Sequence, residues 1–300
     1  MVFKLAHISD VHLGPLPKVR AIELVSKRIT GYINWKRNRA AHMQGDTLSR
    51  LVTAMQGAGP DHIAVTGDLT NLALDDEIAA AALWLGTLGP GEDVSAVPGN
   101  HDAYVPGALA RAVSAWRAFM TTEVADVPTT KHGYPYMRTR GPVALIGVNS
   151  AVATGPFMAS GILSSKQAKS MATLLRRARE KGLFRVVMIH HPPVRRAAAP
   201  QKRLFGIRLF QSVIRAEGAE LVLHGHTHLP QRHEIDGRDG ATVPVIGVPA
   251  AGQAPGGHRP AAAFNMFEIG GEPGAWQCRL HQHALTGKTG GATVTETRDL

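Results

Sequence analysis

Short clusters of histidine, aspartate and asparagine recur along this 300-residue sequence, and these residue types can bind metal ions. The members are Asp10, His12, Asp68, Asn100, His101, Asp102, His190, His191, His226 and His228. Carboxylate, amide and imidazole groups without a thiolate suit Mn, Fe, Zn or Co ions. One ion needs only about four such ligands. The surplus indicates two metal ions that share a bridging carboxylate, as in many hydrolases of phosphate esters.

Each cluster follows an apolar, β-branched run that predicts a buried strand. These runs are KLAHIS, HIAVT, DVSAVP, FRVVMI and AELVLH. Helical patterns lie between them, at residues 46–57, 75–88, 107–121 and 164–182. This alternation predicts an α/β layered fold, and the strand-rich final third favours mixed over purely parallel sheets. Because ligands of α/β sheets bind beyond the carboxyl ends of the strands, we expect the clusters to converge in one crevice.

The motif series D-x-H, G-D, G-N-H-D, H-H-P and G-H-x-H resembles the calcineurin-like metallophosphoesterase superfamily, over roughly residues 3 to 250. The HHPP and GHTH motifs are more similar to its bacterial phosphodiesterases than to its protein phosphatases, which usually carry GDxxDRG and GNHE. The resemblance implies a four-layer α/β/β/α sandwich, in which two mixed sheets pack face to face with helices outside. We expect a single domain over residues 1–300, with a basic helical insert at about 17–45 and a frayed, loop-like tail at about 285–300.

The resemblance also implies a role for each motif residue. One metal ion would be bound by Asp10, His12 and His228, the other by Asn100, His190 and His226, and both by Asp68 as the bridge. In this family the first histidine of H-H-P is the ligand, which selects His190 over His191. A hydroxide that bridges the two metal ions would attack phosphorus in line.

His101 resembles the outer-sphere histidine of the family, which contacts the phosphate and can protonate the leaving oxygen. His101 and Asp68 are therefore the expected catalytic residues. Many family members carry an acidic residue where this chain has Asn71, so the group that orients His101 stays open, with Asp102 as one candidate. The expected substrate contacts are Asn100, His101, His191, Arg195 and Arg196.

The chain is basic, with 33 Lys and Arg against 23 Asp and Glu and a formal net charge of +10. Segment 17–39 places Ile22, Val25, Ile29 and Ile33 at helical spacing among basic residues. Two interpretations stay open: a helix packed on the body with a solvated basic side, or an amphipathic element that contacts an anionic membrane or a phosphate-rich substrate. The pattern SKR…G…N is loosely similar to an insert in family members that cleave a nucleotide–lipid pyrophosphate in lipid A synthesis.

A second basic stretch, at 190–206, starts at the predicted ligand His190. A loop at this point should border the active site. Its Arg195, Arg196, Lys202 and Arg203 either contact a distal phosphate or base of the substrate or form an exposed charged loop. Both interpretations stay open.

Other features of the sequence restrict the cellular compartment and the partners of the protein. The single cysteine, Cys278, suits a reducing compartment, and the first residues lack the pattern of a signal peptide. The sequence holds no apolar run of membrane-spanning length. We expect a cytoplasmic protein, with peripheral attachment to the inner membrane face as the alternative. Aromatic residues make up 5% of the chain, too few to build a stacking platform for bases, so a nucleic-acid partner is not expected.

These observations predict a dinuclear-metal-dependent phosphoesterase with Mn, Fe or Zn as its cofactors. The first substrate class is a small phosphodiester, such as a cyclic nucleotide or a glycerophosphodiester. The runner-up is a nucleotide–lipid pyrophosphate of the UDP-diacylglucosamine type, hydrolysed at the membrane surface. A non-catalytic scaffold of the same fold is a third hypothesis, which the complete ligand set disfavours.

Overall fold

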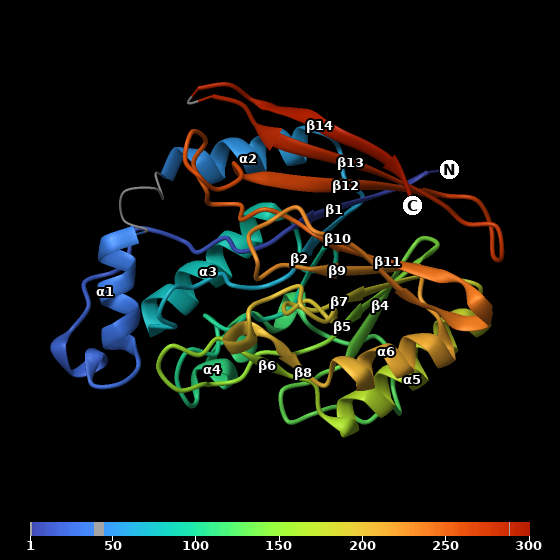
Figure 1. Ribbon diagram of the computed structural model, residues 1–300, viewed down its shortest axis with the longest axis horizontal. Coiled ribbons are helices and arrows are strands. Elements are labelled where there is room, and N and C mark those ends of the chain that lie inside the picture. Colours follow the sequence, from blue (N-terminus) through green and yellow to red (C-terminus); the bar gives the residue numbers. More distant parts are fainter. Residues whose placement is uncertain (1, 39–44, 288) are drawn as a thin grey trace.

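Two six-stranded mixed sheets form the centre of the protein in the computed structural model, which describes residues 2–38, 45–287 and 289–300 (Figure 1). The first sheet has the order β14-β13-β12-β1-β2-β3. Its strands are β1 (Phe3–Ile8), β2 (His62–Val65), β3 (Val94–Ala96), β12 (Ala263–Gly270), β13 (Gln277–Leu285) and β14 (Ala292–Asp299). β1 to β3 are parallel, whereas β12 to β14 continue the sheet from β1 with antiparallel pairing.

The second sheet has the order β10-β11-β9-β7-β5-β4. Its strands are β4 (Tyr136–Arg140), β5 (Val143–Gly147), β7 (Phe184–Met188), β9 (Leu221–His224), β10 (Arg232–Asp236) and β11 (Thr242–Gly247). The four central strands are parallel, and the edge strands β4 and β10 are antiparallel to their neighbours. A short parallel pair, β6 (Gly161–Ile162) and β8 (Leu204–Phe205), stands apart from both sheets.

Six α-helices of the described residues surround the sheets. They are α1 (Arg28–Asn38), α2 (Gly45–Gly57), α3 (Asp75–Leu88), α4 (Ala108–Ala115), α5 (Ser165–Glu180) and α6 (Ile207–Glu217), with 3₁₀ turns η1 (Ala21–Leu24), η2 (Arg117–Phe119), η3 (Pro200–Lys202) and η4 (Arg238–Gly240). Oγ of Ser164 accepts the backbone N–H of Gln167 and caps α5. Within the described ranges, each helix is too short or too polar to cross a bilayer.

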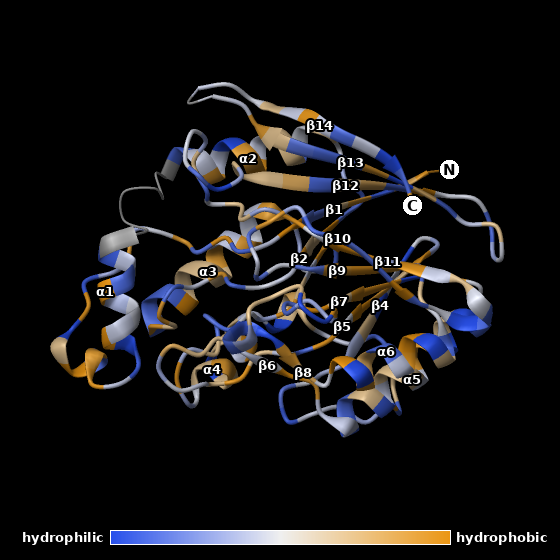
Figure 2. Ribbon diagram, viewed as in Figure 1, coloured by the Kyte–Doolittle hydropathy of each residue, from blue (hydrophilic) through white to orange (hydrophobic). Residues whose placement is uncertain are grey.

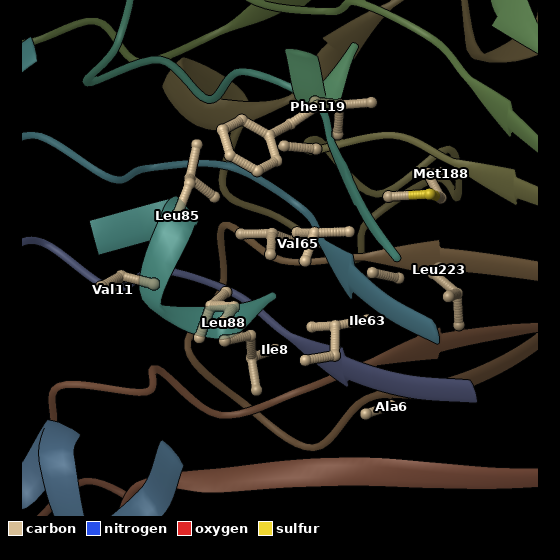
Figure 3. Packing of buried hydrophobic residues seen from close by; sticks show 14 of the residues in the cluster. Ala6, Ile8, Val11, Ile63, Val65, Leu85, Leu88, Phe119, Met188 and Leu223 are labelled. Carbon is tan, nitrogen blue, oxygen red and sulfur yellow. The ribbon is translucent and has the colours of Figure 1, made fainter. Parts of the chain in front are cut away.

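The facing sides of the two sheets share one apolar core. Val65 of the first sheet and Met188 and Leu223 of the second belong to the same buried cluster, and Figure 3 shows their side chains in one packing region. A second cluster lies between the second sheet and the helices α5 and α6, with Leu174 and Phe210 as buried members. The predicted arrangement of two mixed sheets face to face with helices outside is confirmed.

The C-terminal segment differs from the predicted frayed, loop-like tail. Residues 292–299 form β14, which pairs antiparallel with β13. The stretch ATVTETRD is rich in β-branched residues, which fit a pleated, half-buried strand. Gly290 and Gly291 lie directly before β14.

The predicted basic insert forms η1 and then α1, which lies at the left end of the view in Figure 1. Arg39, the last residue of the predicted basic segment, and residues 40–44 lie outside the described residues.

Candidate metal centre

The predicted metal ligands come from both sheets and follow the carboxyl ends of five strands. Asp10 follows β1, Asp68 follows β2 and Asn100 follows β3, while His190 follows β7 and His226 follows β9. Because these strands are parallel within each sheet, their ends reach the same edge. Three groups of side chains there can hold a metal ion: Asp10–His12–His228, His12–Asp68–His101 and Asp68–His190–His226.

The first group surrounds Asp10, whose carboxylate is fully buried. Its Oδ1 atom lies 3.1 Å from Nε2 of His228 and 4.0 Å from Nε2 of His12. Its Oδ2 atom accepts the backbone N–H of His226, whereas Oδ1 has no hydrogen-bond partner in the described part of the chain. A buried carboxylate oxygen without a hydrogen bond is costly. A cation between these side chains would satisfy it.

The second group surrounds the imidazole of His190. Its Nε2 atom lies 3.4 Å from Oδ2 of Asp68, 3.3 Å from Oδ1 of Asn100 and 3.2 Å from Nδ1 of His226. The same Oδ2 atom of Asp68 lies 3.8 Å from Nε2 of His12. Asp68 therefore stands between the two groups, in the position that a shared ligand of two metal ions requires.

Backbone carbonyl groups orient the imidazoles of these groups. Nδ1 of His12 lies 3.1 Å from the carbonyl oxygen of Thr70, and Nδ1 of His190 lies 2.7 Å from that of Thr66. A carbonyl can only accept, so Nδ1 of each ring donates and Nε2 is left as the metal-binding atom. In His226 the two nitrogens have exchanged roles: Nε2 donates to a backbone carbonyl group, and Nδ1 points toward His190. Such outer hydrogen bonds are the usual support of histidine ligands.

Five of the predicted ligands have left-handed backbone conformations, which are uncommon outside glycine. They are Asp10 (φ 53°), His12 (φ 45°), Asp68 (φ 56°), His226 (φ 70°) and His228 (φ 60°). Each such residue costs on the order of 1–3 kcal/mol and persists only where the surrounding structure enforces it, most often at functional sites. The backbone at this edge is thus shaped to aim side chains at a common point.

Two glycines permit the close packing around the carboxylates. A Cβ atom on Gly99 would lie 2.1 Å from Oδ1 of Asp68. A Cβ atom on Gly225 would lie 1.8 Å from Oγ of Ser9 and 2.6 Å from Oδ2 of Asp10. Backbone and carboxylates approach so closely that only glycine fits at either position.

Charges within the cluster favour ionised carboxylates. Burial alone would raise the pKa of Asp10 and of Asp68, but His228 and His190 respectively hold these pKa values below their usual range. Burial likewise opposes protonation of His190, yet the neighbouring Asp68 raises the pKa of His190 to about 9. The carboxylates thus remain ionised beside positive charge, the setting that a bound metal ion also supplies.

Asp102, a candidate partner of His101 in the sequence, instead supports the backbone around Asp68. Its Oδ2 atom accepts the backbone N–H groups of Gly99 and Asp68, and Oδ1 accepts those of the two residues that follow Asp68. Burial and the nearby charge of Asp68 raise the pKa of Asp102 to about 7. The side chain holds together the two loops that carry the central carboxylate and the predicted amide ligand.

His101 is oriented by a carbonyl group. Its Nδ1 atom donates to the backbone oxygen of Asn71 over 2.6 Å, and its ring stacks on Tyr104 with centroids 5.3 Å apart. Its backbone N–H donates to Oδ1 of Asp68 over 2.7 Å. Since the acceptor at position 71 belongs to the main chain, this contact does not depend on an acidic side chain there.

The sequence analysis missed Glu77, a buried carboxylate at the start of α3. Glu77 accepts the backbone N–H groups of Asn71, Leu72 and Leu74 and so fixes the turn whose carbonyl orients His101. Burial raises the pKa of Glu77. A glutamate in the first turn of a helix is common as a cap, which is why the sequence alone does not single it out.

His191, an expected substrate contact, is as buried as the neighbouring His190, and its role toward a substrate stays a prediction. The residue is fully buried, with Nδ1 2.8 Å from Oγ of Ser150 and Nε2 3.1 Å from the carbonyl oxygen of Ala159. Burial and the adjacent His190 lower the pKa of His191 to about 3. The ring of His191 also packs beside the predicted ligands, with its centroid 4.3 Å from that of His226 and 5.0 Å from that of His190.

Arg195 and Arg196 are exposed, and they line a cavity of about 820 Å³ whose walls include Arg203 and Arg208. The loop is tied to the candidate metal centre, because the carbonyl of Lys202 accepts a hydrogen bond from the ring of a predicted histidine ligand. The loop reaches the centre at Lys202, and contact of Arg195 and Arg196 with a substrate stays a prediction.

Two further cations, Arg259 and Lys27, lie near the centre. Nη1 of Arg259 lies 3.2 Å from Nδ1 of His228. Nζ of Lys27 lies 4.8 Å from the ring centroid of Tyr104, which stacks on His101. Lys27 belongs to the SKR pattern of the basic segment, but its contact with Tyr104, like that of Arg259 with His228, joins segments far apart in the chain, which the sequence does not reveal.

Comparison with known proteins agrees with this arrangement. The family model of the calcineurin-like phosphoesterases matches residues 3–230. No curated protein matches the chain.

Among solved structures, a dimetal phosphatase from Danio rerio aligns with a TM-score of 0.63 and 16% identity, over 99% of this chain and 98% of that chain. A purple acid phosphatase from yellow lupin, Lupinus luteus, has a TM-score of 0.58 and 11% identity, over 100% of this chain and 53% of that one. The NAD nucleotidase of Haemophilus influenzae has a TM-score of 0.54 and 12% identity, over 99% and 54% of the two chains. At these identities the likeness shows the fold, and this chain spans about half the length of the latter two.

Proposed function

The chain belongs to the calcineurin-like phosphoesterase family, and from this premise we propose that it hydrolyses phosphoesters with two bound metal ions. The position of Asp68 carries the proposal: its Oδ2 atom lies 3.4 Å from Nε2 of His190 and 3.8 Å from Nε2 of His12. A carboxylate shared between two groups of ligands is the central requirement of a dinuclear site.

The donor atoms support an assignment of ligands to two ions. The first ion is assigned to Asp10, His12 and His228, the second to Asn100, His190 and His226, and Asp68 is shared between them. When bound, the two ions supply Lewis acidity toward the phosphoryl oxygens and make water a nucleophile near neutral pH. The mixture of carboxylate, amide and imidazole donors suits Mn, Fe or Zn.

His101 is the proposed acid. Because Nδ1 donates to the carbonyl of Asn71, Nε2 is the nitrogen that can give a proton to the leaving oxygen. His101 also belongs to a group with His12 and Asp68 whose ligand atoms lie within 4.8 Å of one another. A phosphoryl group at the centre would therefore be within reach of this ring.

The proposed substrate is a small phosphodiester of the cyclic-nucleotide or glycerophosphodiester type, processed in the cytoplasm. Two observations support this substrate class. The motifs have the residue sequences HHPP and GHTH, and the cavity lined by Arg195 and Arg196 has a volume of about 820 Å³, which suits a nucleotide-sized group. Arg195 and Arg196 would bind the part of the substrate beyond the scissile phosphate. A nucleotide–lipid pyrophosphate is the second candidate, which the exposed apolar side chains around η1 favour.

The test is metal removal followed by reconstitution with Mn, Fe or Zn. We expect two metal ions per chain in the active protein, loss of hydrolysis after chelation, and recovery with at least one of these metals. Turnover is measured on an aryl phosphodiester, a cyclic nucleotide, a glycerophosphodiester, a phosphomonoester and a pyrophosphate diester. A chain that purifies without stoichiometric metal and hydrolyses none of these substrates after reconstitution would instead be a scaffold.

A further inference from the structure

Exposed apolar side chains gather along one rim of the molecule. We call this set the apolar rim: Ile22, Val25, Ile29, Ile33, Phe157, Met158, Ile162 and Phe205. These are eight of the thirteen large apolar side chains that are exposed among the described residues. Val25 and Phe157 are exposed by 79% and 85%. Figure 2 shows the apolar residues around η1 at the left end of the molecule.

Three segments that are far apart in the sequence adjoin one another to form this rim. Nζ of Lys27 donates to Oγ1 of Thr154 and to the carbonyl of Met158, each over 2.7 Å, and so joins the η1–α1 region to the loop before β6. Ile162 of β6 pairs with Phe205 of β8. The apolar side chains therefore belong to one continuous part of the surface.

Helix α1 contacts the body through Arg28, Gly31 and Tyr32, and leaves its aliphatic residues Ile29 and Ile33 exposed. Arg28 donates to the backbone oxygen of Leu72 over 2.9 Å. Gly31 packs so closely that a Cβ atom would lie 2.3 Å from the hydroxyl of Tyr104. Ile29 is exposed by 50%.

The segments of the rim also hold the net positive charge of the protein. Segments 17–38 and 194–208 together contain eleven of the 33 basic residues and one of the 23 acidic residues. The remainder of the chain is balanced, with 22 residues of each sign. The single acidic residue, Glu23, is already paired with Arg20. The rim is therefore both apolar and strongly cationic.

The rim borders the candidate metal centre on two sides. Lys27 lies over the ring of Tyr104, and that ring stacks on His101. On the other side, the carbonyl of Lys202 accepts a hydrogen bond from His226. A surface that contacts the rim is thus brought next to the centre.

We propose that the apolar rim docks the protein on a bilayer of anionic lipids, with the metal centre facing the headgroups. The inference rests on the proposed function, because it names the surface at which that centre meets phosphoesters. Apolar side chains enter the boundary of the acyl region while basic side chains contact lipid phosphates. A bilayer supplies both complements, negative charge and apolar volume, over the whole extent of the three segments.

The test is flotation of the full chain with vesicles of phosphatidylcholine, alone or mixed with phosphatidylglycerol. We expect binding to the mixed vesicles, and weakening by about tenfold or more in a Val25→Ser, Phe157→Ser double variant. A Lys18→Glu, Lys36→Glu double variant should also lose binding, and raised salt should weaken that of the unmodified chain. Leu83→Ser is the matched control, since Leu83 is exposed by 77% on α3, outside the rim, and it should bind like the unmodified chain.

The second measurement is hydrolysis of a soluble aryl phosphodiester, which the Val25→Ser, Phe157→Ser variant should retain. Retained hydrolysis without vesicle binding by the unmodified chain overturns the docking inference and leaves the proposed function intact. Vesicle binding by a chain that hydrolyses nothing overturns the proposed function and leaves the docking intact. Equal binding to vesicles without phosphatidylglycerol overturns the role of charge. A dimer that Val25→Ser, Phe157→Ser converts to a monomer, in a chain that ignores vesicles, makes the rim an interface between copies.

Discussion

In the candidate metal centre Asp10 and Asp68 are 0% and 1% exposed, whereas Val25 and Phe157 of the apolar rim are 79% and 85% exposed. In the centre, side chains and backbone hold each other in place. Asp102, for example, accepts four main-chain N–H groups from the loops that carry Asp68 and Asn100. The rim is built from side chains that make few contacts with their own protein. The fold thus fixes the side chains of the buried region, where we propose the reaction, and leaves exposed those of the region where we propose the membrane contact.

From this contrast we expect the effects of substitutions on turnover to differ in size between the two regions. A change at the buried centre disturbs several groups that act together, because each carboxylate there contacts more than one element. A change at the exposed region disturbs one contact, because its side chains act singly and in water. Effects on turnover should therefore fall steeply from the centre to the rim.

The largest effect is expected for Asp68→Asn, which removes the shared charge at the middle of the centre. Turnover should fall by more than about 10³-fold, because transition-state electrostatics and the binding of both metal ions are lost together. Metal content should drop from two ions per chain to one or none by elemental analysis. Asp61→Asn makes the same chemical change at an exposed residue and should alter neither quantity. Two retained metal ions and normal turnover in Asp68→Asn would show that Asp68 does not bridge.

The next effect is expected for His101→Ala, which removes the proposed acid and leaves the ligands in place. Turnover on alkyl phosphodiesters should fall by roughly 10²–10⁴-fold, the usual contribution of a positioned general acid. An aryl phosphodiester should lose much less, because its leaving phenolate needs little protonation. Both metal ions should remain. Equal losses on both substrates would mean that His101 stabilises phosphoryl charge, and loss of metal would mean that it supports the ligands.

Asn71→Ala is the control for that experiment. The acceptor for Nδ1 of His101 is the main-chain oxygen of residue 71, which the substitution keeps. The change removes the side-chain hydrogen bond to the carbonyl of Leu13, a loss of about 1 kcal/mol in the free energy of unfolding. Turnover should change little. A loss as large as that of His101→Ala would show that the side chain of Asn71 is required.

A smaller effect is expected for Asp102→Asn. An amide in place of the carboxylate turns two hydrogens toward backbone N–H donors, so two of the four donors lose their acceptor. The free energy of unfolding should fall by about 1–3 kcal/mol, and turnover by about 10–100-fold, as for other groups that orient metal ligands. Thr70→Val removes the hydroxyl that contacts Oδ1 of Asp102 and the backbone oxygen of His101. It keeps the acceptors of all four main-chain donors, so it should cost less free energy of unfolding and less turnover than Asp102→Asn. Unchanged turnover in Asp102→Asn would show that the loop around Asp68 needs no such support.

The same contrast decides what could be predicted from the sequence. The groups of side chains that could hold a metal ion were predictable from the sequence, because their clusters follow β-branched runs and the ends of parallel strands converge. The acceptor of His101 was not accessible, because it is a carbonyl and leaves no trace in residue type. Glu77 was missed because an acidic residue in a first helical turn has a simpler explanation. The hydrogen bonds of His191 to Ser150 and Ala159 were not accessible either, because these partners lie about 30 to 40 residues away in the chain.

The exposed region was the least predictable. The spacing of Ile22, Val25, Ile29 and Ile33 predicts an amphipathic segment but does not tell which side faces the body. That depends on Arg28 and Gly31, whose partners lie beyond residue 70 in the chain. The prediction of a frayed C-terminal tail was wrong because the structure of the tail, too, depends on another segment of the chain. Its strand β14 exists because β13 offers an edge to pair with, which local composition does not reveal.

The smallest effect is expected at the arginines that border the centre. Arg195→Ala and Arg196→Ala should each raise KM by roughly twofold to fivefold, because exposed charge pairs contribute little in water. The rise in KM should appear with a cyclic nucleotide. It should be absent with a methyl aryl phosphodiester, which has no group to reach the cavity. Raised salt should reduce the difference between the unmodified chain and either variant. kcat should stay nearly constant, because an interaction made equally in ground and transition states does not change it. A hundredfold fall in kcat would mean that an exposed arginine contacts the transferring phosphoryl group, and the division between a buried region for chemistry and an exposed region for recognition would fail.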